Sequence, residues 1–114
     1  PLTRIAFGSC AKETRPQPVW DAINALDPGL FIFTGDNVYA DSGDRAVLAE
    51  SYRKLGEVPG FAALRAECPV LATWDDHDYG ANDAGAEWEG KAAAKEEFMA
   101  FFETAPDSPL RGRE

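Results

Sequence analysis

Three short apolar segments, separated by segments with helical spacing of apolar residues, constrain the fold of this chain most. The apolar segments are residues 2–7, 30–34 and 69–73. Short apolar runs bounded by turn residues are typical of strands, and the second and third have the continuous pattern of strands buried on both faces. Helical patterns occupy residues 18–26, 45–55, 59–66 and 87–102. This alternation predicts an α/β fold with a mostly parallel sheet and right-handed crossovers.

The helical patterns also predict which side chains form the core. In residues 18–26 the spacing places Val19, Ile23 and Leu26 on one face, and the first residue, Pro18, suits a first helical turn. The expected core residues of the two longer helices are Val47, Leu48, Tyr52, Leu55, Trp88, Phe98, Phe101 and Phe102.

Charge and composition exclude several classes of protein. Eleven basic and 20 acidic residues among 114 give a formal charge of -9. This balance argues against a general nucleic-acid binder or a protein that binds anionic membranes, and it suits bound cations. No apolar run approaches the roughly 20 residues that a membrane span needs. Two cysteines, Cys10 and Cys68, do not form a disulfide framework, although one bridge between them stays open.

The residues that follow the three expected strands carry most of the chemically reactive groups. In open α/β sheets, ligands bind outside the carboxyl ends of the strands, and parallel strands bring those ends to one edge. The three segments are Gly8-Ser9-Cys10, Gly35-Asp36-Asn37-Val38-Tyr39 and Trp74-Asp75-Asp76-His77-Asp78. The acidic charge also gathers here, because residues 75–89 hold six acidic side chains and no Lys or Arg.

These side chains suit metal binding. Carboxylates such as Asp36 and Asp76 prefer hard cations, whereas the thiolate of Cys10 and the phenolate of Tyr39 favour a transition metal. A mixed set therefore suggests two different metals, with Asp36 between them. Paired metals stabilise the attacking and leaving oxygens of a phosphoryl displacement, and His77 is placed to act as a general acid or base.

The order and strand context of the three segments resemble the PhoD-like alkaline phosphatase and phosphodiesterase family, within the calcineurin-like metallophosphoesterase group. The Trp-Asp-Asp-His run that begins at Trp74 is the most specific element, followed by Gly35-Asp36-x-x-Tyr39. The resemblance covers residues 4–83. It implies a metallophosphoesterase-like α/β sandwich and hydrolysis of phosphoric mono- or diesters by a metal-activated hydroxide.

The resemblance also implies a role for each matching position. It makes Asp36 the bridge between Fe³⁺ and Ca²⁺, with Cys10 in the place of the first-strand ligand, Tyr39 on the iron and Asp76 on the calcium. It places His77 at the phosphate or the leaving oxygen. It aligns Asn82, more loosely, with a further metal-binding residue. Family members often act outside the cytoplasm, so an extracytoplasmic location is favoured.

Members of this family are several times longer than this chain, and their later metal ligands have no counterpart here. Residues 1–114 are therefore expected to form the N-terminal part of a single, larger catalytic domain.

Simpler readings of the same residues stay open. The chain could instead be a non-catalytic, acidic module that binds cations or a partner. Taken singly, Cys10 is also compatible with a small buried residue, Asp36 with a turn residue and Tyr39 with a packing residue. A nucleotide-binding Rossmann fold is weaker, because no Gly-x-Gly-x-x-Gly follows the first strand.

Overall fold

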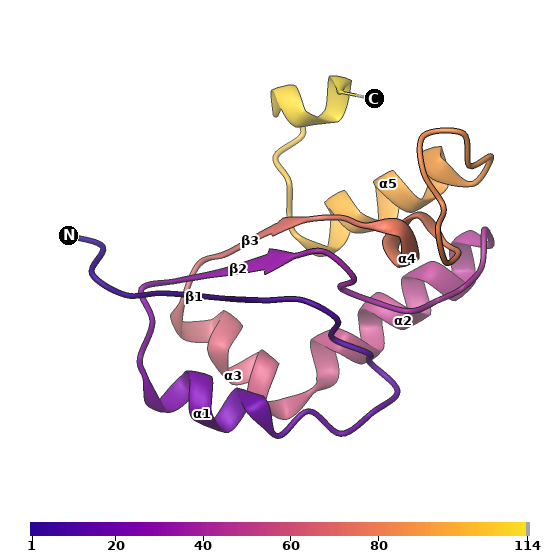
Figure 1. Ribbon diagram of the computed structural model, residues 1–114. Coiled ribbons are helices and arrows are strands. Elements are labelled where there is room, and N and C mark those ends of the chain that lie inside the picture. The colour runs from indigo at the N-terminus through magenta and orange to yellow at the C-terminus, as the bar shows by residue number, and fades with distance from the viewer. Residues whose placement is uncertain (114) are drawn as a thin grey trace.

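The chain folds as an α/β protein around a three-stranded parallel sheet, as the alternation of patterns predicts (Figure 1). The computed structural model describes residues 1–113. The strands are β1 (Ile5–Gly8), β2 (Leu30–Thr34) and β3 (Val70–Thr73), in the spatial order β1-β2-β3. All three carboxyl ends therefore lie at one edge of the sheet.

Five α-helices and one short 3₁₀ helix lie within residues 1–113. They are α1 (Val19–Ala25), α2 (Arg45–Glu57), α3 (Pro59–Glu67), α4 (Asp76–Tyr79), α5 (Lys91–Phe101) and η1 (Pro109–Gly112). The four helices expected from the sequence are confirmed, with some changes of boundary. The short helix α4 and the 3₁₀ helix η1 were not expected. Within the described part of the chain, no helix is both long enough and apolar enough to cross a bilayer.

The start of each long helix has a local cause. The Asp44 carboxylate accepts hydrogen bonds from the backbone N–H groups of Ala46 and Val47, at 2.7 and 3.4 Å, and so caps α2. Pro59 opens α3 at a position where its missing N–H costs nothing. Helix α5 begins at Lys91, not at residue 87, because Gly90 precedes it and Gly is a poor helix former.

The main core lies between one face of the sheet and α1, α2 and α3 (Figure 1). Phe31 and Phe33 of β2 point into it and are each 1% exposed. Their rings lie 5.3 and 5.5 Å, centroid to centroid, from Trp20 of α1 and Phe61 of α3 respectively. Aromatic side chains from α5 and from the residue that follows it pack against the same cluster: Phe98, Phe101 and Phe102. Aromatic contact between strand and helices thus holds the layers together.

The opposite face of the sheet is apolar but largely uncovered, so the expectation of strands buried on both faces is wrong. Phe7, Ile32 and Leu71 form one row across the three strands. Phe7 is 73% exposed and Leu71 is 57% exposed, while Ile32 is partly buried. The short apolar runs reflect a sheet with two apolar faces, of which the described residues cover one.

The face of α1 that packs on the core also differs from the expected one. Val19 and Leu26 are 56% and 61% exposed, whereas Trp20 is 3% exposed and Ile23 packs against the core. Trp20 lies against Phe31 and Phe61, so burial of its larger ring decides how the helix is rotated. Val47 of α2 is likewise 42% exposed, while Leu48, Tyr52 and Leu55 are buried as expected.

Candidate metal centre

The loops that follow the three strands meet at the carboxyl edge of the sheet. The backbone N–H groups of Cys10 and Ala11 donate to the carbonyl oxygens of Gly35 and Asp36, at 3.3 and 3.0 Å. Gly35 has a φ of +112°, and a Cβ atom there would lie 2.7 Å from the Cβ of Asp75. The close approach of the loops after β2 and β3 therefore requires glycine at this position.

Asp36 lies at the centre of this edge. One of its carboxylate oxygens, Oδ2, accepts hydrogen bonds from the Tyr39 hydroxyl at 2.8 Å and from the Cys10 thiol at 3.6 Å. The other oxygen, Oδ1, is buried and has no hydrogen-bond donor among the described residues. A buried carboxylate oxygen without a donor is costly, and a bound cation would offset that cost.

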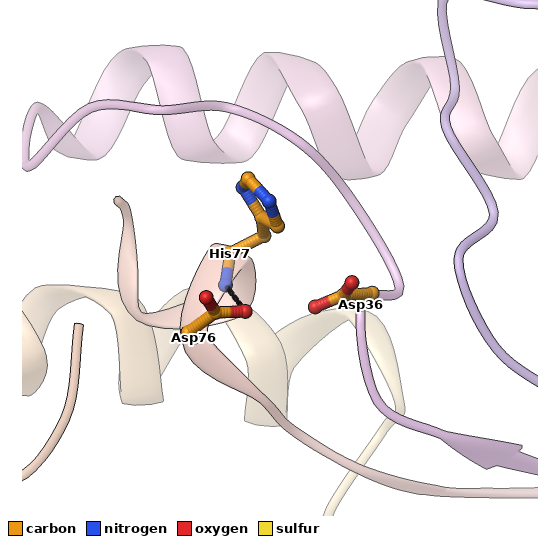
Figure 2. Close-up of side chains that lie close together, drawn as sticks. All are labelled: Asp36, Asp76 and His77. Atoms are coloured by element: carbon orange, nitrogen blue, oxygen red, sulfur yellow. Dashed lines mark hydrogen bonds between the residues drawn. The ribbon is translucent and has the colours of Figure 1, made fainter. Parts of the chain in front are cut away.

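Asp36, Asp76 and His77 together form a cluster with metal-ligand spacing. One ligand atom from each of the three lies within 4.8 Å of the others. Figure 2 shows the two carboxylates pointing toward one another. The His77 ring lies above them in this view, and the His77 backbone N–H donates to the Asp76 carboxylate. Asp36 comes from the loop after β2, whereas Asp76 and His77 begin α4 after β3.

The surroundings of Asp76 favour its charged form. A hydrogen bond from the Asp83 backbone N–H, helped by that of His77, lowers the pKa of the Asp76 carboxyl. For Tyr39, burial raises the pKa of the phenol well above its usual value, and the neighbouring Cys10 and Asp36 raise it further. Without a cation, Tyr39 therefore stays protonated and donates to Asp36.

His77 is oriented by a residue that the sequence did not single out. Its Nδ1 lies 2.7 Å from Oδ1 of Asp41, and its ring lies 4.2 Å, centroid to centroid, from that of Tyr39. An ionised carboxylate only accepts hydrogen bonds, so Nδ1 carries the proton of this bond and Nε2 stays free. Asp41 follows Tyr39 by two residues in the same loop, and no spacing rule distinguishes it from a turn residue.

Asp78 is a second residue whose role the sequence did not reveal. Its side chain is 0% exposed, and it accepts hydrogen bonds from the loops after β2 and β3. Burial raises the pKa of its carboxyl to about 6, against the lowering effect of the backbone N–H groups that bond to it. The acidic pattern predicted a charged segment but gave no sign that this one member is buried.

Strained backbone also gathers at this edge. Six non-glycine residues have positive φ angles, and four belong to these loops: Cys10, Asp36, Asp41 and Asp83, at 61°, 51°, 47° and 61°. Such conformations are uncommon outside glycine and cluster at functional sites.

Four of the six side chains expected at the site, Cys10, Tyr39, Asp76 and His77, thus lie around a fifth, Asp36. The amide of the sixth, Asn82, donates to the Asp83 carboxylate at 2.6 Å. Asp83 in turn bonds Asp76 through its backbone. Both cysteines are free, Cys10 exposed and Cys68 buried, so the disulfide that the sequence left open is absent.

The fold and this edge define an α/β protein whose parallel sheet carries a carboxylate–histidine cluster at its carboxyl edge. No protein-family model, curated protein or solved structure matches the chain significantly.

Proposed function

We propose that the chain belongs to a metal-dependent hydrolase of phosphoric mono- or diesters, as part of a longer parent protein. The observation that carries this proposal is the convergence of Asp36, Asp76 and His77, with one buried oxygen of Asp36 lacking a donor. The motif resemblance to the PhoD-like phosphatases and phosphodiesterases supports the same reading.

The donor set fits two different cations. Cys10 and Tyr39 contact one oxygen of Asp36, and both would serve as ligands for Fe³⁺ once deprotonated. Asp76 presents a carboxylate with a lowered pKa, which suits Ca²⁺. When bound, such metals polarise a phosphoryl oxygen and lower the pKa of water.

The protein's own residues would then position and protonate the substrate. Asp41 bonds Nδ1 of His77, and the Tyr39 ring packs against the imidazole. These two contacts set the orientation of the ring and hence the position of Nε2. From this position, the doubly protonated imidazole would donate its Nε2 proton to the leaving oxygen of a phosphate ester and return to the neutral form that keeps its proton on Nδ1. The loop after β2 and the start of α4 hold the Asp36 and Asp76 carboxylates close together without a cation, which reduces the reorganisation needed on binding.

The uncovered sheet face supports a finer proposal about the fold. Phe7 and Leu71 lie on an exposed apolar face of three strands, opposite the helices. A metallophosphoesterase-like sandwich, in which further parts of the parent domain cover this face, would bury these side chains.

One observation favours a second function, a module that binds cations without catalysis. The cluster found within residues 1–113 contains Asp36, Asp76 and His77, and even with Cys10 and Tyr39 the set has fewer ligands than two fully coordinated metals need. In this case, binding would survive in assays where hydrolysis fails.

Hydrolysis of p-nitrophenyl phosphate and bis-p-nitrophenyl phosphate by the full chain and by its parent protein tests the proposal. We expect activity that a chelator abolishes, and at least a roughly 100-fold loss in Asp36→Asn. Asp27→Asn is the matched control, because Asp27 is exposed and forms its ion pair with Arg4 away from this edge. Full activity in Asp36→Asn would exclude the metal-bridging role. Metal binding without hydrolysis in either protein would favour the non-catalytic module.

A further inference from the structure

The buried carboxylate of Asp78 joins the two loops that carry the candidate metal ligands. From the loop after β2, the Asn37 backbone N–H lies 3.0 and 3.1 Å from its two oxygens, and the Asn37 amide nitrogen lies 3.0 Å from Oδ2. The Val38 backbone N–H adds a longer contact to Oδ1, at 3.3 Å. From the loop after β3, the Asp75 backbone N–H lies 3.0 Å from Oδ2.

The sequence neighbours of these donors are the candidate ligands themselves. Asn37 directly follows Asp36, and Asp75 directly precedes Asp76. Asp78 itself belongs to α4, one residue after His77. The Asp78 carboxylate therefore fixes the backbone next to each of the three clustered residues, Asp36, Asp76 and His77.

A third element strengthens this junction. The Tyr52 hydroxyl of α2 lies 3.3 Å from Oδ1 of Asp78. The Asn37 amide, besides its bond to Asp78, donates to the Thr73 carbonyl at the end of β3 at 2.9 Å. Asn37 and Asp78 are both 0% exposed, so water does not compete for these bonds.

The chemistry of the junction suits positioning rather than charge pairing. Each donor to Asp78 is an uncharged N–H or O–H group, and most are backbone groups with directions set by the chain. A flexible Lys or Arg partner would leave the loop backbones free to shift. Outer partners that orient ligands change metal affinity by about 10- to 100-fold when they are mutated.

We infer that Asp78 is a positioning residue that holds Asp36 against Asp76 and His77 in the geometry that a divalent cation requires. The inference rests on the proposed function, because it assumes that the cluster binds a metal. It adds a residue that contacts no cation but sets how tightly one binds.

Mn²⁺ binding to the purified full chain, followed by the loss of the free-ion paramagnetic resonance signal, tests this role. Asp78→Asn preserves the size of the side chain but turns an amide group toward backbone N–H donors, so at least one hydrogen bond is lost. We expect its Mn²⁺ dissociation constant to rise about 10-fold or more. Near-UV circular dichroism of the tryptophans would show that the variant is folded.

A matched control separates positioning from general stability. Phe61→Leu loosens the core around Trp20 and Phe33, away from the loops. We expect it to lower stability while its Mn²⁺ affinity stays within about twofold of wild type.

One result would contradict the positioning role of Asp78 alone, and a different result would contradict the metal centre itself. If wild type binds Mn²⁺ and folded Asp78→Asn binds it equally well, the positioning role is wrong. If wild type binds no Mn²⁺, the metal centre fails and the inference fails with it. Should Asp78→Asn not fold, Tyr52→Phe decides, because it removes one hydroxyl donor and keeps the buried ring. A several-fold weaker affinity in Tyr52→Phe would support the role, and an unchanged affinity would contradict it.

Discussion

At the scale of single residues, Asp36 differs from the other acidic side chains of the chain. Its neighbours Cys10 and Tyr39 donate to one oxygen, while the second oxygen is buried without a donor. A simple turn residue would instead expose its carboxylate to water or use it to bond nearby backbone N–H groups. The unpaired, buried oxygen of the Asp36 carboxylate is the strongest local argument for a cation at this edge.

The two cysteines should react very differently. Cys10 is exposed, whereas Cys68 is buried and burial raises the pKa of its thiol. The thiolate is the reactive form, so the raised pKa slows the labelling of Cys68, and burial also keeps the reagent away from the sulfur. Unfolding should therefore accelerate the labelling of Cys68 more than a rise in pH does. Titration with a chromogenic disulfide reagent at pH 8 should give one fast thiol and one slower by about 100-fold or more.

Cys10→Ser is the control, since it should remove the fast phase alone. Zn²⁺ should slow the fast phase if the Cys10 thiol takes part in metal binding. Equal rates for both thiols in native wild type would contradict the burial of Cys68.

At the scale of elements, the loop after β2 depends on the glycine at its start. Gly35→Ala introduces a side chain at a φ of +112° and only 2.7 Å from the Cβ of Asp75. We expect it to lower the free energy of unfolding by about 1–3 kcal/mol and to weaken cation binding, because it separates the loops after β2 and β3. Urea unfolding, with and without Ca²⁺, measures both effects.

Gly8→Ala is the matched control for this substitution. A Cβ at Gly8 would meet only the Phe31 ring, at an ordinary 3.8 Å. We expect a change of stability within about 1 kcal/mol, in either direction. A similar loss of stability in both variants would show that the close contact between Gly35 and Asp75 is not the reason why the loop after β2 requires glycine.

The elements also show where sequence patterns are reliable. All three strands and four of the helices follow from apolar spacing and from turn residues such as Pro59. Helix α4 was missed because it has four residues and depends on its cap. The Asp75 and Asp78 side chains bond each other's backbone N–H groups, which stabilises a turn too short for any periodic pattern.

At the scale of the whole molecule, charge and apolar surface are unevenly distributed. Six acidic side chains and no Lys or Arg lie within residues 75–89, the segment that includes Asp76 and His77 of the candidate metal centre. The uncovered apolar row through Phe7 and Leu71 lies on the sheet face opposite the helices. Much of the net charge of -9 is therefore concentrated in one segment. The acidic side chains of that segment repel one another, and a bound cation would reduce the repulsion.

Cation binding should consequently stabilise the whole fold. A ligand that binds only the native state adds about 2.7 kcal/mol when its concentration is 100 times the dissociation constant. We expect Ca²⁺ to raise the unfolding temperature more than Na⁺ does at equal ionic strength, because Na⁺ only screens the repulsion.

In Asp36→Asn, Ca²⁺ and Na⁺ should raise the unfolding temperature by the same amount. In Asp27→Asn, Ca²⁺ should still raise it more than Na⁺ does. Thermal unfolding followed by circular dichroism measures all three proteins. An equal effect of Ca²⁺ and Na⁺ on wild type would indicate screening without a specific site.

The sequence by itself determined the order of elements, the parallel sheet and the edge at which reactive side chains gather. These features follow from local periodicity and from the rule that parallel strands share a carboxyl edge. Only the tertiary structure decided which sheet face is covered, that Trp20 directs α1 into the core, that Asp41 bonds His77, and that Asp78 bonds the loop after β2. Those outcomes depend on contacts between residues far apart in the chain, such as Asn37 and Asp78, which are 41 positions apart, and no local pattern encodes them.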